Sequence, residues 1–108
     1  MKDREFLNRI RVESLSFFTK DLPHTEKEFK NGYLDATQDW YRIKTGSRKT
    51  TINPYLYKKL DDFFEKATDC FYYAEVLQQD IIRGDQKLNK MWSELQNTAR
   101  LLQRDPWV

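Results

Sequence analysis

Apolar side chains recur every three or four residues along most of this 108-residue chain, and this spacing constrains the fold more than any other feature. It indicates helices with one face in a protein core, and no useful stretch shows the alternation of a half-buried strand. Turn and capping residues interrupt the pattern three times. The sequence therefore predicts an all-α, single-domain four-helix bundle, with helices at about 2–20, 25–44, 54–83 and 86–104.

Capping residues mark where these helices begin. Thr25 and Glu28 fit a capping box, in which each side chain satisfies a backbone N–H group. Asn53 stands before Pro54, the residue that suits a first helical position, and Asp85 can cap the last helix. Short connections favour an up-down order, in which the third helix is the longest.

The apolar faces predict which residues form the core. On the first segment, Phe17 and Phe18 fall within the apolar sector, whereas Leu15 lies just beyond it. On the third segment, the apolar stripe continues as far as Ile81. Gly32 lies inside the second helix, where either a close helix–helix approach or simple drift of the sequence would explain it.

The residues used in catalysis and metal binding are scarce. His24 is the single histidine and belongs to a loop, and Cys70 is the single cysteine and lies within an apolar stripe. Acidic residues do cluster, and such groups can bind a hard cation, but they fall on predicted polar faces. We therefore expect no enzyme, no catalytic residue, no cofactor and no metal site. The acidic residues are Asp61, Asp62 and Glu65 on one helix and Asp35 and Asp39 on another.

Charge is distributed unevenly although the net charge is only +2. Residues 40–60 contain six basic side chains and no acid, and in an up-down bundle they lie at the same end as Arg4 and Arg104. Basic side chains interleaved with aromatic rings suit a nucleic acid or an acidic partner. The candidate contacts are Arg42, Lys44, Arg48, Lys49, Lys58, Lys59, Tyr55 and Tyr57.

The third helix also carries apolar residues away from its main stripe. Tyr72 and Val76 fall nearly opposite that stripe, and Tyr73 lies on its flank. Such residues are either covered by another helix of the same chain or form a partner surface. They are the candidate surface for a protein partner.

These observations lead us to expect a small non-catalytic helical protein that binds another macromolecule. A protein partner is the leading hypothesis, with a regulator, adaptor or inhibitor as the role; nucleic-acid binding through the basic linker is the alternative. A homodimer stays open. The chain has no apolar run of the length that a membrane span requires and no signal-peptide pattern at its start, so we expect a cytoplasmic protein without membrane contact.

Overall fold

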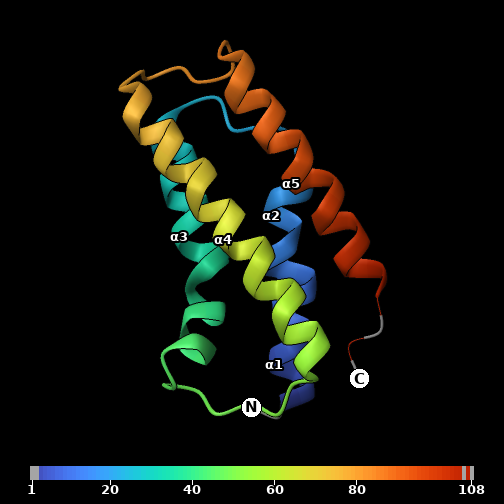
Figure 1. The fold of residues 1–108 in the computed structure, drawn as a ribbon. Coiled ribbons are helices and arrows are strands. Elements are labelled where there is room, and N and C mark those ends of the chain that lie inside the picture. Colours follow the sequence, from blue (N-terminus) through green and yellow to red (C-terminus); the bar gives the residue numbers. More distant parts are fainter. Residues whose placement is uncertain (1–2, 106, 108) are drawn as a thin grey trace.

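Four helices run up and down in chain order within the described residues, 3–105 and 107, of this computed structural model (Figure 1). The first helix is continuous but has a π-helical middle, and the other three are regular. This arrangement confirms the all-α four-helix bundle with a long third helix. The elements are α1 (Asp3–Arg9), η1 (Ile10–Ser14), α2 (Leu15–Thr19), α3 (Glu26–Lys44), α4 (Pro54–Leu77) and α5 (Gln86–Arg104).

The predicted caps form at the start of α3, α4 and α5. Thr25 Oγ1 accepts a hydrogen bond from the backbone N–H of Glu28 (3.1 Å). The side-chain oxygens of Asn53 and Asp85 each accept one from the first turn of their helix at 2.8 Å. These bonds satisfy N–H groups that have no partner within the helix, and they fix where each helix begins.

The π-helical segment changes which residues of the first helix are buried. It contains one more residue than a regular α-helix would, so the residues that follow are rotated by about 100°. Leu15 and Phe18 therefore become fully buried on the same side as the core residues of α1, and Phe17 turns to the flank and is partly buried. The sequence prediction, which placed Phe17 inside the apolar sector and Leu15 beyond it, is wrong for this reason.

The third helix ends at Leu77, six residues before the predicted end. Gln78 adopts a left-handed conformation (φ 51°) and stops the helix, although neither glycine nor asparagine stands there. The chain then crosses the top of the bundle, where Ile81 forms an antiparallel bridge with Thr25. Ile81 is 69% exposed and Ile82 is buried in its place, so the prediction that Ile81 continues the core stripe is also wrong.

A close contact explains Gly32 of α3. A Cβ atom at this position would lie 2.6 Å from Cζ and 2.8 Å from Cδ1 of the Phe17 ring. That ring cannot easily move, because it contacts Phe18, Phe29 and Trp92 edge to face at centroid distances of 5.0, 6.2 and 5.6 Å. The close approach, rather than sequence drift, is therefore the reason for the glycine.

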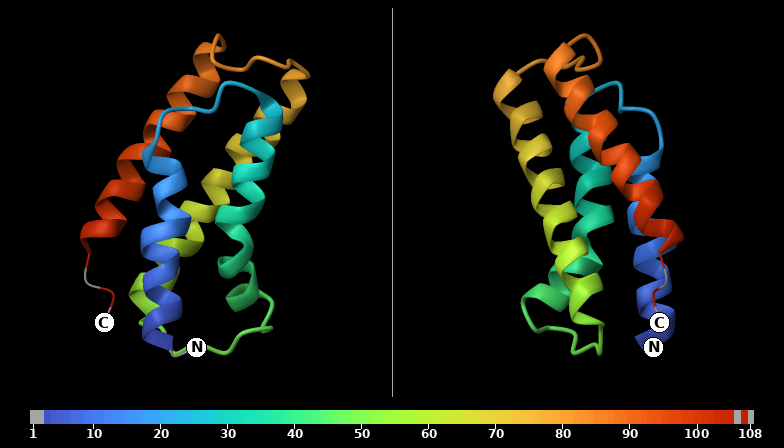
Figure 2. Two further views of the ribbon diagram at one scale, coloured as in Figure 1. Left: turned by 180° about the vertical axis from the view of Figure 1, so that it is seen from behind. Right: turned by 45° about the vertical axis from the view of Figure 1, so that its right-hand side comes forward.

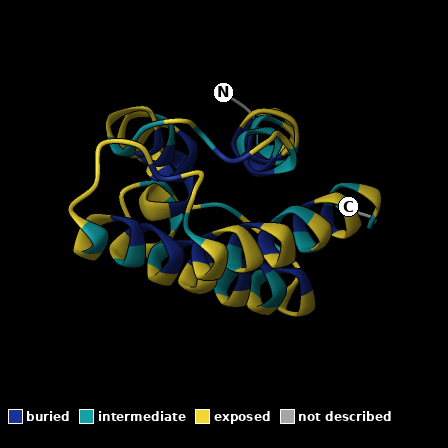
Figure 3. Cartoon of the chain, turned by 90° about the horizontal axis from the view of Figure 1, so that it is seen from above, coloured by how far each residue is buried: buried dark blue, intermediate teal, exposed yellow. Residues whose placement is uncertain are grey.

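The buried side of each helix faces the shared interior, as the view from above shows (Figure 3). Aromatic rings fill much of this interior, including Trp40 stacked on Phe64 at 5.4 Å and Tyr33 stacked on Phe71 at 4.3 Å. Among the described residues, no helix combines the length and the apolar character needed to cross a membrane.

Candidate functional site

The basic linker lies at the end of the bundle where α1 begins and α5 ends (Figure 2). Four of its six basic side chains are paired with acids, and two of these acids, Asp3 and Asp105, come from the two ends of the described chain. Pairing of this kind lowers the positive potential that the sequence predicts here. The pairs are Arg42 with Asp39 (3.2 Å), Lys44 with Asp61, Arg48 with Asp3 (3.6 Å) and Lys59 with Asp105 (2.9 Å).

Asp39 is buried, whereas the sequence placed it on a solvated polar face. Its two carboxylate oxygens accept hydrogen bonds from Arg9 Nε (2.6 Å) and Nη2 (2.7 Å), and Arg42 approaches the same carboxylate. This bidentate bond raises the pKa of Arg9. Asp39 therefore joins α1 to α3 and is not available as a ligand for a cation.

The remaining linker candidates differ in accessibility. Lys49 and Lys58 are exposed, and no acid lies within ion-pair distance of either in the described part of the chain. Tyr55 is 71% exposed, with the Lys59 ammonium 4.4 Å from its ring centroid. Tyr57 instead packs against Trp40 at 5.2 Å and is partly buried, so it is poorly placed to stack on a base.

A second basic region lies beside the linker and is built from the two ends of the described chain. A hollow of about 390 Å³ separates the first helix from the end of α5, and we call it the arginine hollow. Asp105, the one acid among the described residues that line it, is paired with Lys59. The hollow is lined by Arg4, Leu7, Asn8, Arg11, Arg104, Asp105 and Trp107.

The π-helical segment places Arg11 in this hollow. Gln103 of α5 donates from Nε2 to the Arg11 carbonyl (2.9 Å) and approaches Ser16 Oγ at 3.2 Å, which fixes α5 against the segment. Arg11 Nη2 donates to Asn8 Oδ1 (3.1 Å). Topology brings Arg4 and Arg104 to this end, but sequence reasoning misses Arg11, because the phase shift that turns it toward α5 depends on tertiary contacts.

The predicted partner surface on α4 contains two exposed residues and one that is structural. Tyr72 is 58% exposed and Val76 is 76% exposed, one helical turn apart. Tyr73 is partly buried, and its hydroxyl donates to Asp85 at 3.1 Å, the residue that caps α5. The Lys87 ammonium lies 4.9 Å from the centroid of the Tyr73 ring. Tyr73 therefore holds the α4–α5 connection and contributes little accessible surface.

Exposed apolar side chains of α3 adjoin this surface. Tyr33 of α3 stacks on Phe71 of α4, so the residues that follow them, Leu34 and Tyr72, lie at the same level of the bundle. Leu34 is 53% exposed, and Tyr41 is 41% exposed. We call four exposed apolar and aromatic side chains of α3 and α4, which are Leu34, Tyr41, Tyr72 and Val76, the tyrosine face.

Hydroxyl groups order one part of the tyrosine face. Thr68 Oγ1 donates its one hydrogen to the Phe64 carbonyl (2.8 Å), so it accepts a hydrogen bond from Tyr33 Oη (2.7 Å). Tyr33 Oη in turn accepts a hydrogen bond from Tyr41 Oη (3.1 Å). Burial is the main cause that raises the pKa of Tyr33. This chain of bonds fixes the Tyr41 ring across the boundary between α3 and α4.

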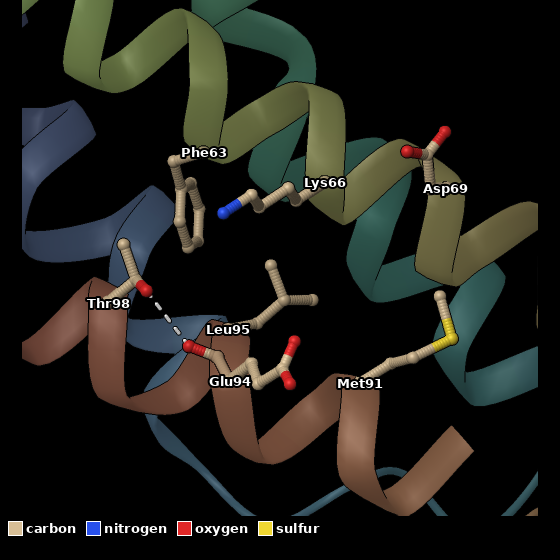
Figure 4. A pocket seen from close by; sticks show the side chains of 7 residues that line it. All are labelled: Phe63, Lys66, Asp69, Met91, Glu94, Leu95 and Thr98. Atoms are coloured by element: carbon tan, nitrogen blue, oxygen red, sulfur yellow. Dashed lines mark hydrogen bonds between the residues drawn. The ribbon is translucent and has the colours of Figure 1, made fainter. Parts of the chain in front are cut away.

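A narrow groove between α4 and α5 is a further concave feature (Figure 4). It encloses about 180 Å³ over an apolar base formed by Phe63, Met91 and Leu95. Lys66 and Glu94 extend from opposite helices into the same space, and Thr98 Oγ1 donates to the Glu94 carbonyl at 2.9 Å. Its volume is below the range typical of small-molecule pockets, about 300–1,000 Å³.

The chain's rare reactive side chains are not assembled for chemistry. Burial raises the pKa of the Cys70 thiol to about 12, which disfavours the nucleophilic thiolate. His24 lies exposed in the loop before α3. Within the residues that the structure describes, no three His, Cys, Asp or Glu side chains gather in a metal-binding arrangement.

No protein-family model, curated protein or solved structure matches this chain.

Proposed function

We propose that this chain is a non-catalytic helical-bundle protein that binds another protein through the tyrosine face. The observation that carries the proposal is the exposure of Tyr72 (58%) and Val76 (76%) beside Leu34 and Tyr41 of the adjoining helix. Single exposed apolar residues are normal, whereas several on adjoining elements indicate an interaction surface.

The chemistry of the tyrosine face suits a protein partner. Tyrosine is enriched at the centres of protein interfaces because its ring offers a large contact area with only two rotatable bonds. The hydroxyl chain from Tyr41 through Tyr33 already fixes one ring in the unbound protein, so binding costs less side-chain entropy. A regulator, adaptor or inhibitor needs no more than such a surface, and a cytoplasmic location is part of this proposal.

The proposal includes the expectation that the chain is not an enzyme, and three observations support this expectation. The buried Cys70 stays a neutral thiol at physiological pH because its pKa is about 12. Asp39 is committed to Arg9, and Asp61 to Lys44, so neither acidic cluster keeps a full set of available oxygens. A thermal shift with Mg²⁺, Ca²⁺ or Mn²⁺ tests this point, and clear stabilisation by one of them would contradict it.

The test compares matched surface variants in a pull-down from the cells that make the chain. The double variant Tyr72→Ala, Val76→Ser should lose a partner that the unmodified protein retains, with thermal stability nearly unchanged because both side chains are exposed. Leu101→Ser is the control, since Leu101 is 59% exposed on α5, away from the tyrosine face. A partner that the double variant retains and Leu101→Ser loses would contradict the proposal.

A second copy of the chain is one possible partner. Light scattering over a range of concentrations measures this directly, because a homodimer through the tyrosine face gives a mass that falls on dilution. The Tyr72→Ala, Val76→Ser variant should then stay monomeric. A dimer that survives this double change would place the self-association elsewhere.

Nucleic-acid binding through the linker is the second candidate function. It is favoured by the exposure of Lys49, Lys58 and Tyr55 at one end, while the pairing of the other linker bases with acids weakens it. Replacing Lys49 and Lys58 with glutamate should abolish binding of labelled single-stranded DNA and leave a protein partner bound. DNA binding that is unaffected by this change would remove the linker from consideration.

A further inference from the structure

Among the described residues, the arginine hollow is lined by three basic side chains and one acidic side chain. Arg4, Arg11 and Arg104 all line it, and a guanidinium group keeps its charge at any physiological pH. Among the described residues, none of these three side chains forms an ion pair, whereas the linker bases beside them mostly do. Asp105, the single acid among the described lining residues, is paired with Lys59 at 2.9 Å. The charge of the hollow therefore favours an anion.

The donors suit a phosphate group in particular. Each guanidinium presents a planar fork that can bind two oxygens of one phosphate. Arg11 is only partly exposed, and its bond to Asn8 Oδ1 (3.1 Å) fixes the side chain. Gln103 fixes the backbone of the same residue from α5. The hollow is thus held in shape by bonds from both of its walls.

An aromatic ring stands beside these donors. Trp107 lines the hollow, is partly buried against the core, and donates from Nε1 to the Leu102 carbonyl at 2.7 Å. That bond anchors the indole, and a fixed aromatic ring is a surface on which a nucleic-acid base can stack. The volume of about 390 Å³ falls within the range of small-molecule pockets.

We propose that the arginine hollow binds a nucleotide, with its phosphate held by Arg4, Arg11 and Arg104 and its base stacked on Trp107. The ligand is either a free mononucleotide or the 5′-phosphorylated end of a nucleic-acid strand, which present the same chemical group. The site lies between the first helix and α5, apart from the tyrosine face on α3 and α4, so it is independent of the proposed protein binding.

Calorimetric titration with three probes at low salt tests each half of the site. Adenosine monophosphate should bind more tightly than inorganic phosphate, which lacks the base, and more tightly than adenosine, which lacks the phosphate. Binding should also change the tryptophan fluorescence, because Trp40 and Trp92 are buried and Trp107 lines the hollow. Adenosine binding as tightly as its monophosphate, or no binding of either phosphate probe, would overturn the proposal.

Matched arginine variants show whether binding is local. Arg11→Gln with Arg104→Gln should weaken adenosine monophosphate at least tenfold, and Arg100→Gln should change it less than twofold, since Arg100 is exposed on α5 and does not line the hollow. If the double variant is unstable, Arg104→Gln alone replaces it in this test, because Arg104 is exposed. Equal weakening by Arg100→Gln would overturn the proposal in favour of non-specific charge attraction.

Two further arms separate the sources of the ligand and the role of the ring. If the hollow binds strand ends, a short DNA strand with a 5′-phosphate should bind more tightly than the same strand with a 5′-hydroxyl. If the ligand is a free mononucleotide, the mononucleotide should bind and neither strand should. Trp107→Phe should abolish the fluorescence change and retain stacking in part. Phosphate binding that neither the base nor the Trp107 change affects would overturn the nucleotide assignment.

Discussion

The linker, with six basic side chains, and the arginine hollow, with three, lie at the same end of the bundle but differ in the acids around them. Four basic side chains of the linker each pair with an acid; these acids are Asp3, Asp39, Asp61 and Asp105. In the described part of the chain no acid pairs with an arginine of the hollow. A basic stretch of sequence is therefore not by itself a basic surface, because acids outside that stretch decide which positive charge is available.

Removing Asp39 should lower the stability of the protein more than any other change, because Arg9 and Arg42 would both lose their acidic partner. Asp39→Ala takes both acceptors from Arg9 and one from Arg42, so we expect the free energy of unfolding to fall by about 2 kcal/mol in urea titration. Asp35→Ala is the control, one turn earlier on the same helix and exposed. If the free energy of unfolding falls equally little in both variants, the pair of Arg9 with Asp39 does not stabilise the bundle.

A smaller effect is expected from the residue that holds the hollow together. Gln103→Ala removes the bonds to the Arg11 carbonyl and to Ser16, and should cost about 1 kcal/mol by urea titration. Asn97→Ala, at an exposed position of the same helix, should change stability far less. A stable Gln103→Ala protein whose nucleotide affinity is also unchanged would show that the hollow is not built through this residue.

Mutual repulsion in the hollow should be measurable as a gain in stability when charge is removed. In a low-salt buffer without phosphate, Arg11→Gln with Arg104→Gln should stabilise the protein by about 0.5 kcal/mol, and added salt should erase the difference. Lys49→Gln with Lys58→Gln gives the comparison at the linker, where little change is expected. If the Arg11→Gln, Arg104→Gln variant is instead less stable than the unmodified protein, an acid neutralises these arginines in the hollow.

The smallest change in stability is expected from releasing the paired linker bases. Asp61→Asn with Asp105→Asn would remove the exposed partners of Lys44 and Lys59 and leave unfolding nearly unchanged. The same change should strengthen DNA binding and steepen its dependence on salt by about two ions, measured by fluorescence anisotropy. An unaltered salt dependence would mean that the linker does not contact the nucleic acid.

Local signals predicted the helices well because their causes are local. Thr25, Asn53 and Asp85 act on N–H groups only two or three residues away, so a short stretch of sequence contains all the information for these caps. The end of α4 has no such signal. Gln78 takes a conformation that its residue type does not favour, since the following segment pairs with the chain before α3.

The candidate sites could be predicted only in part for the same reason. Exposure of Tyr72 and Val76 follows from helical phase, which the sequence supplies. The structural role of Tyr73 depends on Asp85, and the arginine hollow depends on the orientation of Arg11 after a phase shift. Contacts between residues far apart in the chain determine both, and one sequence does not reveal them.

The π-helical segment has a consequence for insertion and deletion of residues. Because Ile10–Ser14 holds one residue more than a regular helix needs, a chain lacking Val12 would form an unbroken α-helix. In that shortened helix Leu15 and Phe18 would still face the core. Deleting one residue removes the one extra residue that the π-helical segment contains, so the residues after it keep their orientation. The first helix is therefore a place where the length of this chain can change by one residue without disturbing the core.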